Sequence, residues 1–122
     1  MEMDLEINSI RRLETFIKRT SANKKVWGLE SDGGWFVCES NEYEDTLVML
    51  FWSDRAYAQQ CKDQHDLSNY HPAVLDLDGF IEQWLEGLDR DGLLVGLNWS
   101  AKLIGTESEP MDIAKALEEQ ML

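Results

Sequence analysis

Two apolar runs constrain the fold of this chain more than any other feature. Residues 46–52 are apolar at nearly every position, and residues 93–99 form a further apolar run. A strand of consecutive apolar residues is typically covered on both faces, whereas a half-exposed strand alternates apolar and polar residues. We therefore expect the strand at 46–52 to be central in its sheet.

Shorter patterns place the remaining elements around these two strands. Residues 25–30 and 35–40 predict a hairpin, because the segment between them contains the Asp-Gly and Gly-Gly pairs that tight turns need. Residues 72–77 predict a short edge strand that begins with proline. Helices are expected from Asn8 or Ser9 to about Thr20, after a capping Ser53, after Asp76 or Asp78, and from Pro110 onward. Ile10 in the first of these helices and Met111 in the last are expected to face inward.

The order of these elements indicates one domain. A helix precedes three strands, and helices and strands then alternate up to a last helix. This order predicts an α+β fold over residues 1–122, with a mostly antiparallel or mixed sheet of about four to five strands and helices packed against it. A chain of 122 residues needs no disulfide or metal to hold its core together, and we expect Cys38 and Cys61 to be buried reduced thiols.

The helix after Asp78 has the clearest apolar stripe. Its acidic residues lie opposite the stripe, whose members are Phe80, Ile81, Trp84, Leu85 and Leu88. This is the pattern of a helix laid across a sheet. Truncating a tryptophan buried in such a stripe costs about 3–5 kcal/mol. The stripe therefore predicts that Trp84→Ala leaves the protein largely unfolded, whereas Glu86→Ala changes stability by less than about 0.5 kcal/mol.

The charge of the chain limits its partners. Eleven Lys and Arg stand against 24 Asp and Glu, which gives a formal net charge of −13. Binding to nucleic acid or to an anionic membrane depends on cationic side chains, so we expect neither. A basic protein is the partner that this charge favours, and a monomer is preferred over a homodimer because like copies repel. The amino terminus lacks the features of a signal peptide and the longest apolar run is six residues, so a cytoplasmic location is expected.

No catalytic or metal-binding motif emerges from the sequence. Asp89 and Asp91 match two ligand positions of an EF-hand loop, but Gly87 and Asn98 stand where the loop needs an acidic first ligand and a bidentate Glu. Cys61 and the two histidines lack the paired spacing of a structural zinc site. We therefore expect no catalytic residue, no metal and no cofactor, and a protein that is not an enzyme.

The tryptophans provide the best candidates for a binding site. Trp52 and Trp99 each end an apolar strand, and if these strands are parallel neighbours, their side chains lie at one rim of the sheet. Aromatic rings beside small polar groups form a plausible binding groove. The candidate binding residues are Trp35, Trp52, Ser53, Asn98, Trp99 and Ser100. The alternative is that most tryptophans are core residues with a hydrogen-bonded indole N–H.

Four segments together resemble a known bacterial family. They are Trp27–Trp35 (WGLESDGGW), Leu50–Ala58 (LFWSDRAYA), Phe80–Leu85 (FIEQWL) and Asp91–Trp99 (DGLLVGLNW), and they are similar to the domain of unknown function 2750 family. The resemblance implies a small stand-alone bacterial protein and brings no established activity or catalytic residue. A fainter similarity, over Leu50–Ala58 and Val95–Asn98, is to the amino-terminal domain of the SseB-like proteins.

Two classes of function fit these observations. The first is a protein-interaction or regulatory module without catalytic activity, including an immunity or antitoxin-like partner of a basic protein. The second is a small-molecule or peptide binder, or an enzyme with an unmarked site, that uses the groove formed by Trp52, Asn98 and Trp99.

Overall fold

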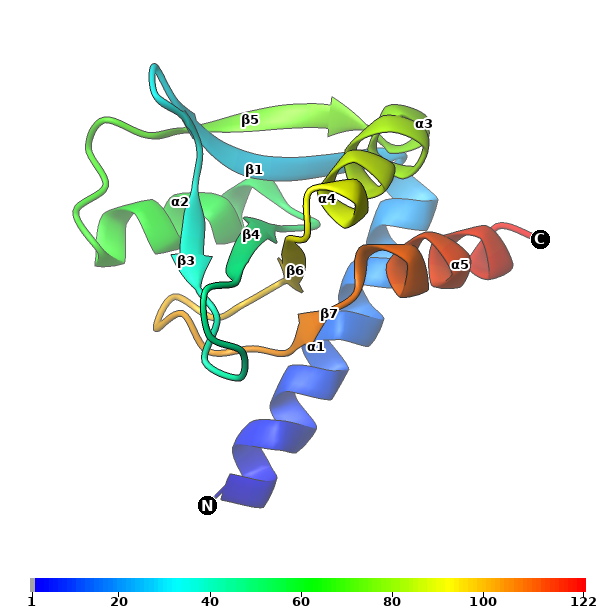
Figure 1. The fold of residues 1–122 in the computed structure, drawn as a ribbon, viewed down its shortest axis with the longest axis horizontal. Coiled ribbons are helices and arrows are strands. Elements are labelled where there is room, and N and C mark those ends of the chain that lie inside the picture. The colour runs from blue at the N-terminus through cyan, green and yellow to red at the C-terminus, as the bar shows by residue number, and fades with distance from the viewer. Residues whose placement is uncertain (1) are drawn as a thin grey trace.

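Two small β-sheets form the framework of the domain (Figure 1). The computed structural model describes residues 2–122, with side chains from residue 8 onward. The first sheet is antiparallel, and its strands are in spatial order β2 (Gly34–Trp35), β1 (Lys25–Ser31) and β5 (His71–Asp76). The second is mixed, and its strands are β3 (Val37–Glu39), β4 (Leu47–Phe51), β6 (Leu94–Leu97) and β7 (Glu107–Ser108). A bridge between Trp27 and Trp52 joins the two sheets.

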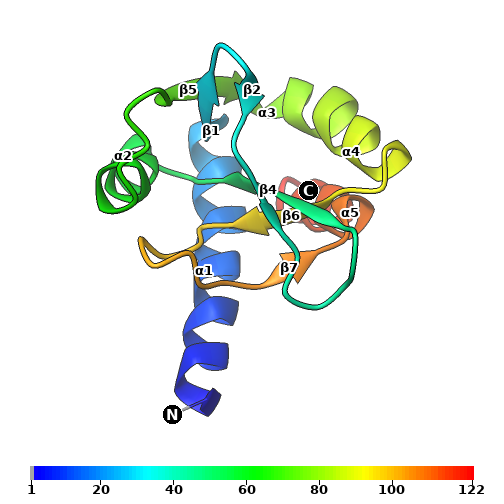
Figure 2. The ribbon, with the colours of Figure 1, turned by 60° about the vertical axis from the view of Figure 1, so that its left-hand side comes forward.

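Helices pack around these sheets, which confirms the predicted α+β class. They are α1 (Glu2–Asn23), α2 (Arg55–Gln64), α5 (Pro110–Gln120) and a continuous segment made of α3 (Leu77–Gly79), the π-helix η1 (Phe80–Leu85) and α4 (Glu86–Arg90). The amino-terminal part of α1 extends beyond the rest of the domain (Figure 2). Within residues 2–122, no helix combines the length and the apolar character that crossing a membrane requires.

Strand β4 is central in the second sheet, as its apolar run predicts. It pairs antiparallel with β3 and parallel with β6, where Val48 lies opposite Leu94 and Phe51 opposite Leu97. Successive side chains of β4 enter different clusters, with Phe51 on one face and Leu50 on the other. Both faces of the strand are buried, which explains why its sequence does not alternate.

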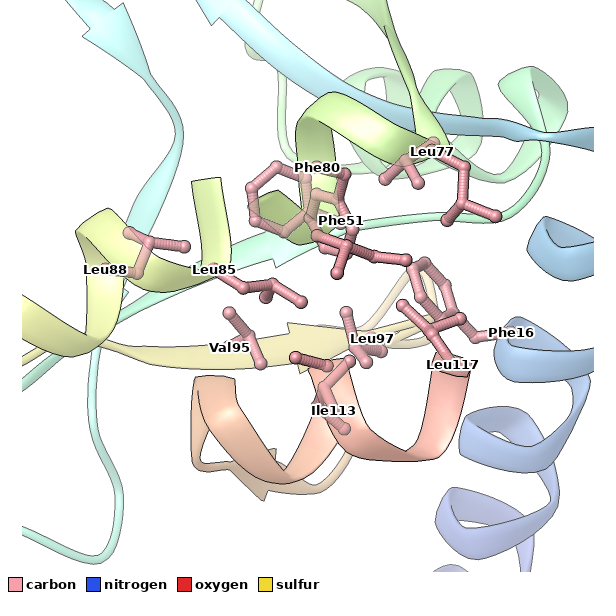
Figure 3. Close-up of a cluster of buried hydrophobic side chains, with 13 residues drawn as sticks. Phe16, Phe51, Leu77, Phe80, Leu85, Leu88, Val95, Leu97, Ile113 and Leu117 are labelled. Carbon is pink, nitrogen blue, oxygen red and sulfur yellow. The ribbon is translucent and has the colours of Figure 1, made fainter. Parts of the chain in front are cut away.

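The larger core lies between the sheets and helices α1, η1, α4 and α5 (Figure 3). Phe51 and Phe80 meet edge to face at its middle, with ring centroids 4.9 Å apart. Phe16 of α1 reaches the same place, 6.2 Å from Phe80. The buried members are Phe16, Val26, Phe51, Leu77, Phe80, Ile81, Leu85, Leu88, Val95, Leu97, Ile113, Ala114 and Leu117.

A second core fills the opposite face of β4, under α2. It contains Trp52 and Trp99 together with the buried thiol of Cys61. Phe36 and Tyr70 close one side of it, with their rings edge to face at 5.4 Å. The buried members are Leu29, Val48, Leu50, Trp52, Ala58, Cys61, Leu94 and Trp99. Two separate cores thus share one central strand.

The first helix is longer than predicted, and two residues that were predicted to face inward are exposed. The helix begins at Glu2 instead of at Asn8 or Ser9, because no glycine or proline interrupts the chain before Asn23. Ile10 is 44% exposed whereas its neighbour Ser9 is buried, so Ile10 lies on the solvent side of α1. Met111 is also 44% exposed, in the first turn of α5.

The predicted hairpin forms, but its second strand divides between the two sheets. Gly34 takes the positive φ that the turn requires, at 125°. Only two residue pairs of β2 then face β1, and after Phe36 the chain passes to β4 as β3. The Trp35 ring lies directly over Gly28, where an added Cβ would stand 2.6 Å from the ring. Glycine at this position is therefore what allows the indole to pack against β1.

The apolar stripe after Asp76 packs as predicted, except at Trp84. Asp76 caps the helical segment, because its Oδ2 accepts a hydrogen bond from the Gly79 N–H at 3.0 Å. The other four stripe residues are buried, but Trp84 is only half-buried. Its ring packs edge to face on Trp35 at 4.8 Å, at the border of the core. The expected cost of truncating Trp84 is therefore smaller than the stripe alone predicts.

The buried thiol of Cys61 gives the first testable prediction. Burial raises the pKa of Cys61 to about 11, with a smaller contribution from the nearby Cys38. Only the thiolate reacts, so about one Cys61 in a thousand is reactive at pH 8, and this fraction rises about tenfold per pH unit up to the pKa. In the native protein we expect a disulfide reagent to label the half-buried Cys38 first, and both residues in urea. Equal native rates at pH 8 would contradict the burial of Cys61.

Candidate functional site

A cavity lies where the parallel strands β4 and β6 end. Its volume is about 350 Å³, and its walls come from α1, α2 and the segment that follows β6. The lining residues are Arg12, Thr15, Tyr57, Gln60, Asn98, Trp99, Ser100 and Ala101. The space beyond the carboxyl ends of parallel strands is where open α/β sheets commonly bind ligands, because the chain turns away there and leaves a crevice.

Asn98 joins the ends of the two parallel strands. Its Oδ1 accepts a hydrogen bond from the Ser53 N–H at 2.8 Å, and its Nδ2 donates to the Ser53 Oγ at 3.0 Å. Its own N–H donates to the carbonyl of Phe51 at 2.9 Å. Both Asn98 and Ser53 are almost completely buried, at 4% and 3% exposed. Asn98 has φ of 53°, a left-handed conformation that asparagine tolerates better than most residues.

A chain of polar contacts continues from Asn98 toward α1. The Ser53 Oγ donates to Asp54 Oδ1 at 2.6 Å, and Asp54 Oδ2 accepts from Arg19 at 2.7 Å. The hydrogen bond and charge of Asp54 raise the pKa of Arg19. Ser53 was predicted to cap α2, but the helix starts one residue later, with Asp54 as the capping residue. The Ser53 hydroxyl is instead occupied by Asp54 and Asn98.

The two tryptophans that follow these strands are mainly core residues. Trp52 is fully buried, and its indole N–H donates to the carbonyl of Trp99 at 3.0 Å. Trp99 is 4% exposed, and its N–H donates to the carbonyl of Thr106 at 2.7 Å. Its ring fits between Gly96 and Gly105, where any added Cβ would overlap the indole. Trp99 contributes to the cavity wall, whereas Trp52 supports that wall from behind.

The segment after Trp99 is held in place by local hydrogen bonds. The Ser100 Oγ accepts from the N–H groups of Lys102 and Ile104, both at 3.3 Å, and the Ser100 N–H donates to the Ile104 carbonyl. The Nε2 of His65, the residue that caps the end of α2, is 2.6 Å from the Ala101 carbonyl oxygen. This part of the cavity wall is therefore fixed by hydrogen bonds within the segment and by a contact with the end of α2.

The structure brings together five of the six candidate binding residues. Trp52, Ser53, Asn98, Trp99 and Ser100 are contiguous at the ends of β4 and β6, because these strands are parallel neighbours. The sixth, the half-buried Trp35, packs in the larger core on the opposite face of β4, away from this cavity. Its neighbour Phe36 packs in the second core, because successive side chains of an extended segment point to opposite faces.

Four cavity residues come from two helices that the sequence analysis did not connect with the site. Arg12 and Thr15 are three residues apart on α1, and Tyr57 and Gln60 are three apart on α2. A spacing of three puts both members of each pair on one helix face. Two polar or amphipathic pairs at this spacing are the signal that could have identified these walls, although which helices meet cannot be derived from spacing alone.

The residues weighed as metal ligands do not converge. Cys61 is buried in the second core, and His65 contacts the Ala101 carbonyl. His71 is exposed on β5, with its Nε2 4.0 Å from a Glu30 carboxylate oxygen. Among the described residues, no group of three or more His, Cys, Asp or Glu side chains could hold a metal ion together.

Comparison with known proteins identifies the family of this chain. No curated protein matches the sequence. A family model described as a protein of unknown function, DUF2750, matches residues 13–117. The matched range runs from the middle of α1 into α5 and includes the four segments whose resemblance was noted from the sequence, so that prediction is confirmed. The chain belongs to the DUF2750 family.

Proposed function

We propose that this protein is a non-catalytic binding module of the bacterial cytoplasm that takes a small molecule, or the end of a peptide, into the cavity at the ends of β4 and β6. The observation that carries the proposal is the composition of the cavity wall. Thr15, Tyr57, Gln60 and Ser100, which carry hydroxyl or amide groups, line the cavity together with Trp99. A small concave site with an aromatic wall and a few polar groups is the usual form of a small-molecule site.

Rigidity of the wall supports the same proposal. The Asn98–Ser53 hydrogen bonds fix the two strand ends, and Trp99 is locked between two glycines. A site whose residues are already held in place loses little conformational entropy when a ligand binds.

The net charge of −13 supports a monomer, because like copies repel each other. Recognition of a basic protein is a prediction from this charge alone.

A fragment screen tests the proposal. The probes are a panel of small neutral, cationic and anionic compounds, and the readout is the indole N–H signal of Trp99 in proton–nitrogen correlation spectra. We expect some compounds to shift this signal, which can be assigned with Trp99→Phe. Gln60→Phe places a ring in the cavity mouth from an exposed position and should abolish the shifts.

The control is Gln64→Phe, which adds the same ring to an exposed position of α2 that does not line the cavity. It should keep the shifts. A panel that leaves the Trp99 signal unchanged, or shifts that survive Gln60→Phe, would contradict binding in this cavity.

A further inference from the structure

The cavity differs in charge from the rest of the protein. The chain as a whole has a net charge of −13, yet none of the described residues that line the cavity is Asp or Glu. Arg12 is the one charged residue among them. The nearest acidic side chain in the polar chain described above, Asp54, is already bound by Arg19 and Ser53. The residues that line the cavity thus carry one positive charge in an otherwise acidic protein.

Arg12 is available for a ligand. Its side chain is half-buried, and it forms no ion pair with any residue whose side chain is described, which covers residues 8–122. Arg19 lies two turns further along the same side of α1. Unlike Arg12, it forms an ion pair, because its guanidinium is 2.7 Å from the Asp54 carboxylate. A partly buried guanidinium has lost part of its hydration, so an anion that binds it regains charge-assisted hydrogen bonds.

The shape of the guanidinium selects the kind of anion. Its planar fork of N–H donors matches the oxygens of a carboxylate or a phosphate in a bidentate arrangement. The hydroxyls of Thr15, Tyr57 and Ser100 also line the cavity and can donate to the remaining oxygens. Trp99, which is 4% exposed, adds a small apolar surface to the cavity wall, and a volume of about 350 Å³ is near the lower limit for ligand sites.

We propose that the ligand of this cavity is a small molecule that combines an oxyanion, a carboxylate or a phosphate, with a flat apolar part: Arg12 binds the oxyanion and Trp99 contacts the apolar part. This inference rests on the proposed function, because it names the ligand class of the same site. It adds that the site selects by charge and that one residue of α1 provides the selection.

The test compares benzoate with benzamide, which have nearly the same shape but differ in charge. Titration calorimetry at constant ionic strength should show benzoate binding at least about tenfold more tightly than benzamide, a difference of about 1.4 kcal/mol. Arg12→Gln should remove this preference, and Arg12→Lys should retain part of it, because lysine keeps the charge without the fork. Phenyl phosphate, measured beside benzoate, shows which oxyanion the site prefers.

Arg11→Gln is the matched control, because Arg11 is exposed on the same helix and does not line the cavity. It should leave the benzoate preference unchanged. An equal loss in Arg11→Gln and Arg12→Gln would mean that general charge attraction is responsible, and would overturn the inference. Equal binding of benzoate and benzamide would also overturn it while leaving the proposed function intact. If none of these three probes binds but other panel compounds shift the Trp99 signal, the inference fails alone; if no compound binds, both fail.

Discussion

Replacing Phe51 with alanine is expected to destabilise the protein by about 3–5 kcal/mol, a large share of the stability of a domain of this size. Phe51 is fully buried on the central strand, and its ring contacts Phe80, Trp35 and Trp84, with centroids 4.9, 6.4 and 6.2 Å away. Its loss leaves a cavity bordered by both sheets and η1, which cannot easily collapse. Chemical denaturation should show a large fall in the free energy of unfolding, or an unfolded protein.

Two further variants calibrate this effect. Glu86→Ala, at an exposed position of α4, should change stability by less than about 0.5 kcal/mol. Trp84→Ala should fall between the two, because the Trp84 ring contacts the same cluster but is half-exposed. If the free energy of unfolding of Phe51→Ala lies within about 1 kcal/mol of the wild-type value, the core can repack around the missing ring. That result would contradict the expectation that β4, which is packed between two cores, cannot move to fill the space.

Replacing Asn98 with alanine is expected to cost about 2–4 kcal/mol, although no apolar core volume is lost. The change leaves the Ser53 N–H without its acceptor and the Ser53 Oγ without one of its two partners, in a region where water has little access. A buried polar group that loses its partner costs about 1–3 kcal/mol. Alanine also adopts the left-handed conformation less readily, which adds about 1 kcal/mol at φ of 53°.

Asn98→Gly separates these two contributions. Glycine loses the same hydrogen bonds but accepts a positive φ, so it should be more stable than Asn98→Ala by about 1 kcal/mol. Asn69→Ala, at an exposed position between α2 and β5, serves as the control and should have little effect. If the alanine and glycine variants at residue 98 unfold at the same denaturant concentration, the backbone conformation contributes nothing. If both match the wild type, the Ser53 hydrogen bonds do not stabilise the fold.

The central strand could be predicted because its run is both apolar and short. Residues 47–51 are apolar at every position but too few for a typical helix, which favours a strand covered on both faces. The rim of Trp52, Asn98 and Trp99 followed from the same reasoning, once β4 and β6 proved to be parallel. The hairpin turn was equally predictable, because positive φ favours glycine.

The rest of the site depended on contacts that local patterns do not specify. Arg12 and Thr15 belong to α1, and Tyr57 to α2, and only tertiary packing brings these helices to opposite sides of one cavity. The burial of Trp52 was also unpredictable, because an aromatic residue at a strand end can face a core or a groove with the same sequence. The same ambiguity applies to Trp99. Its indole is buried because Gly96 has no side chain and leaves a space that the ring fills.

The parallel ladder between β4 and β6 also has a kinetic consequence. Val48 and Leu94 are paired in space but about 46 residues apart in the chain, and α2, β5 and the helical segment lie between them. Joining such distant segments reduces chain entropy before the ladder forms, and proteins rich in non-local contacts fold more slowly than helical proteins of similar size. The strand that gives both cores a common wall therefore makes the folding rate depend on loop closure across more than a third of the sequence.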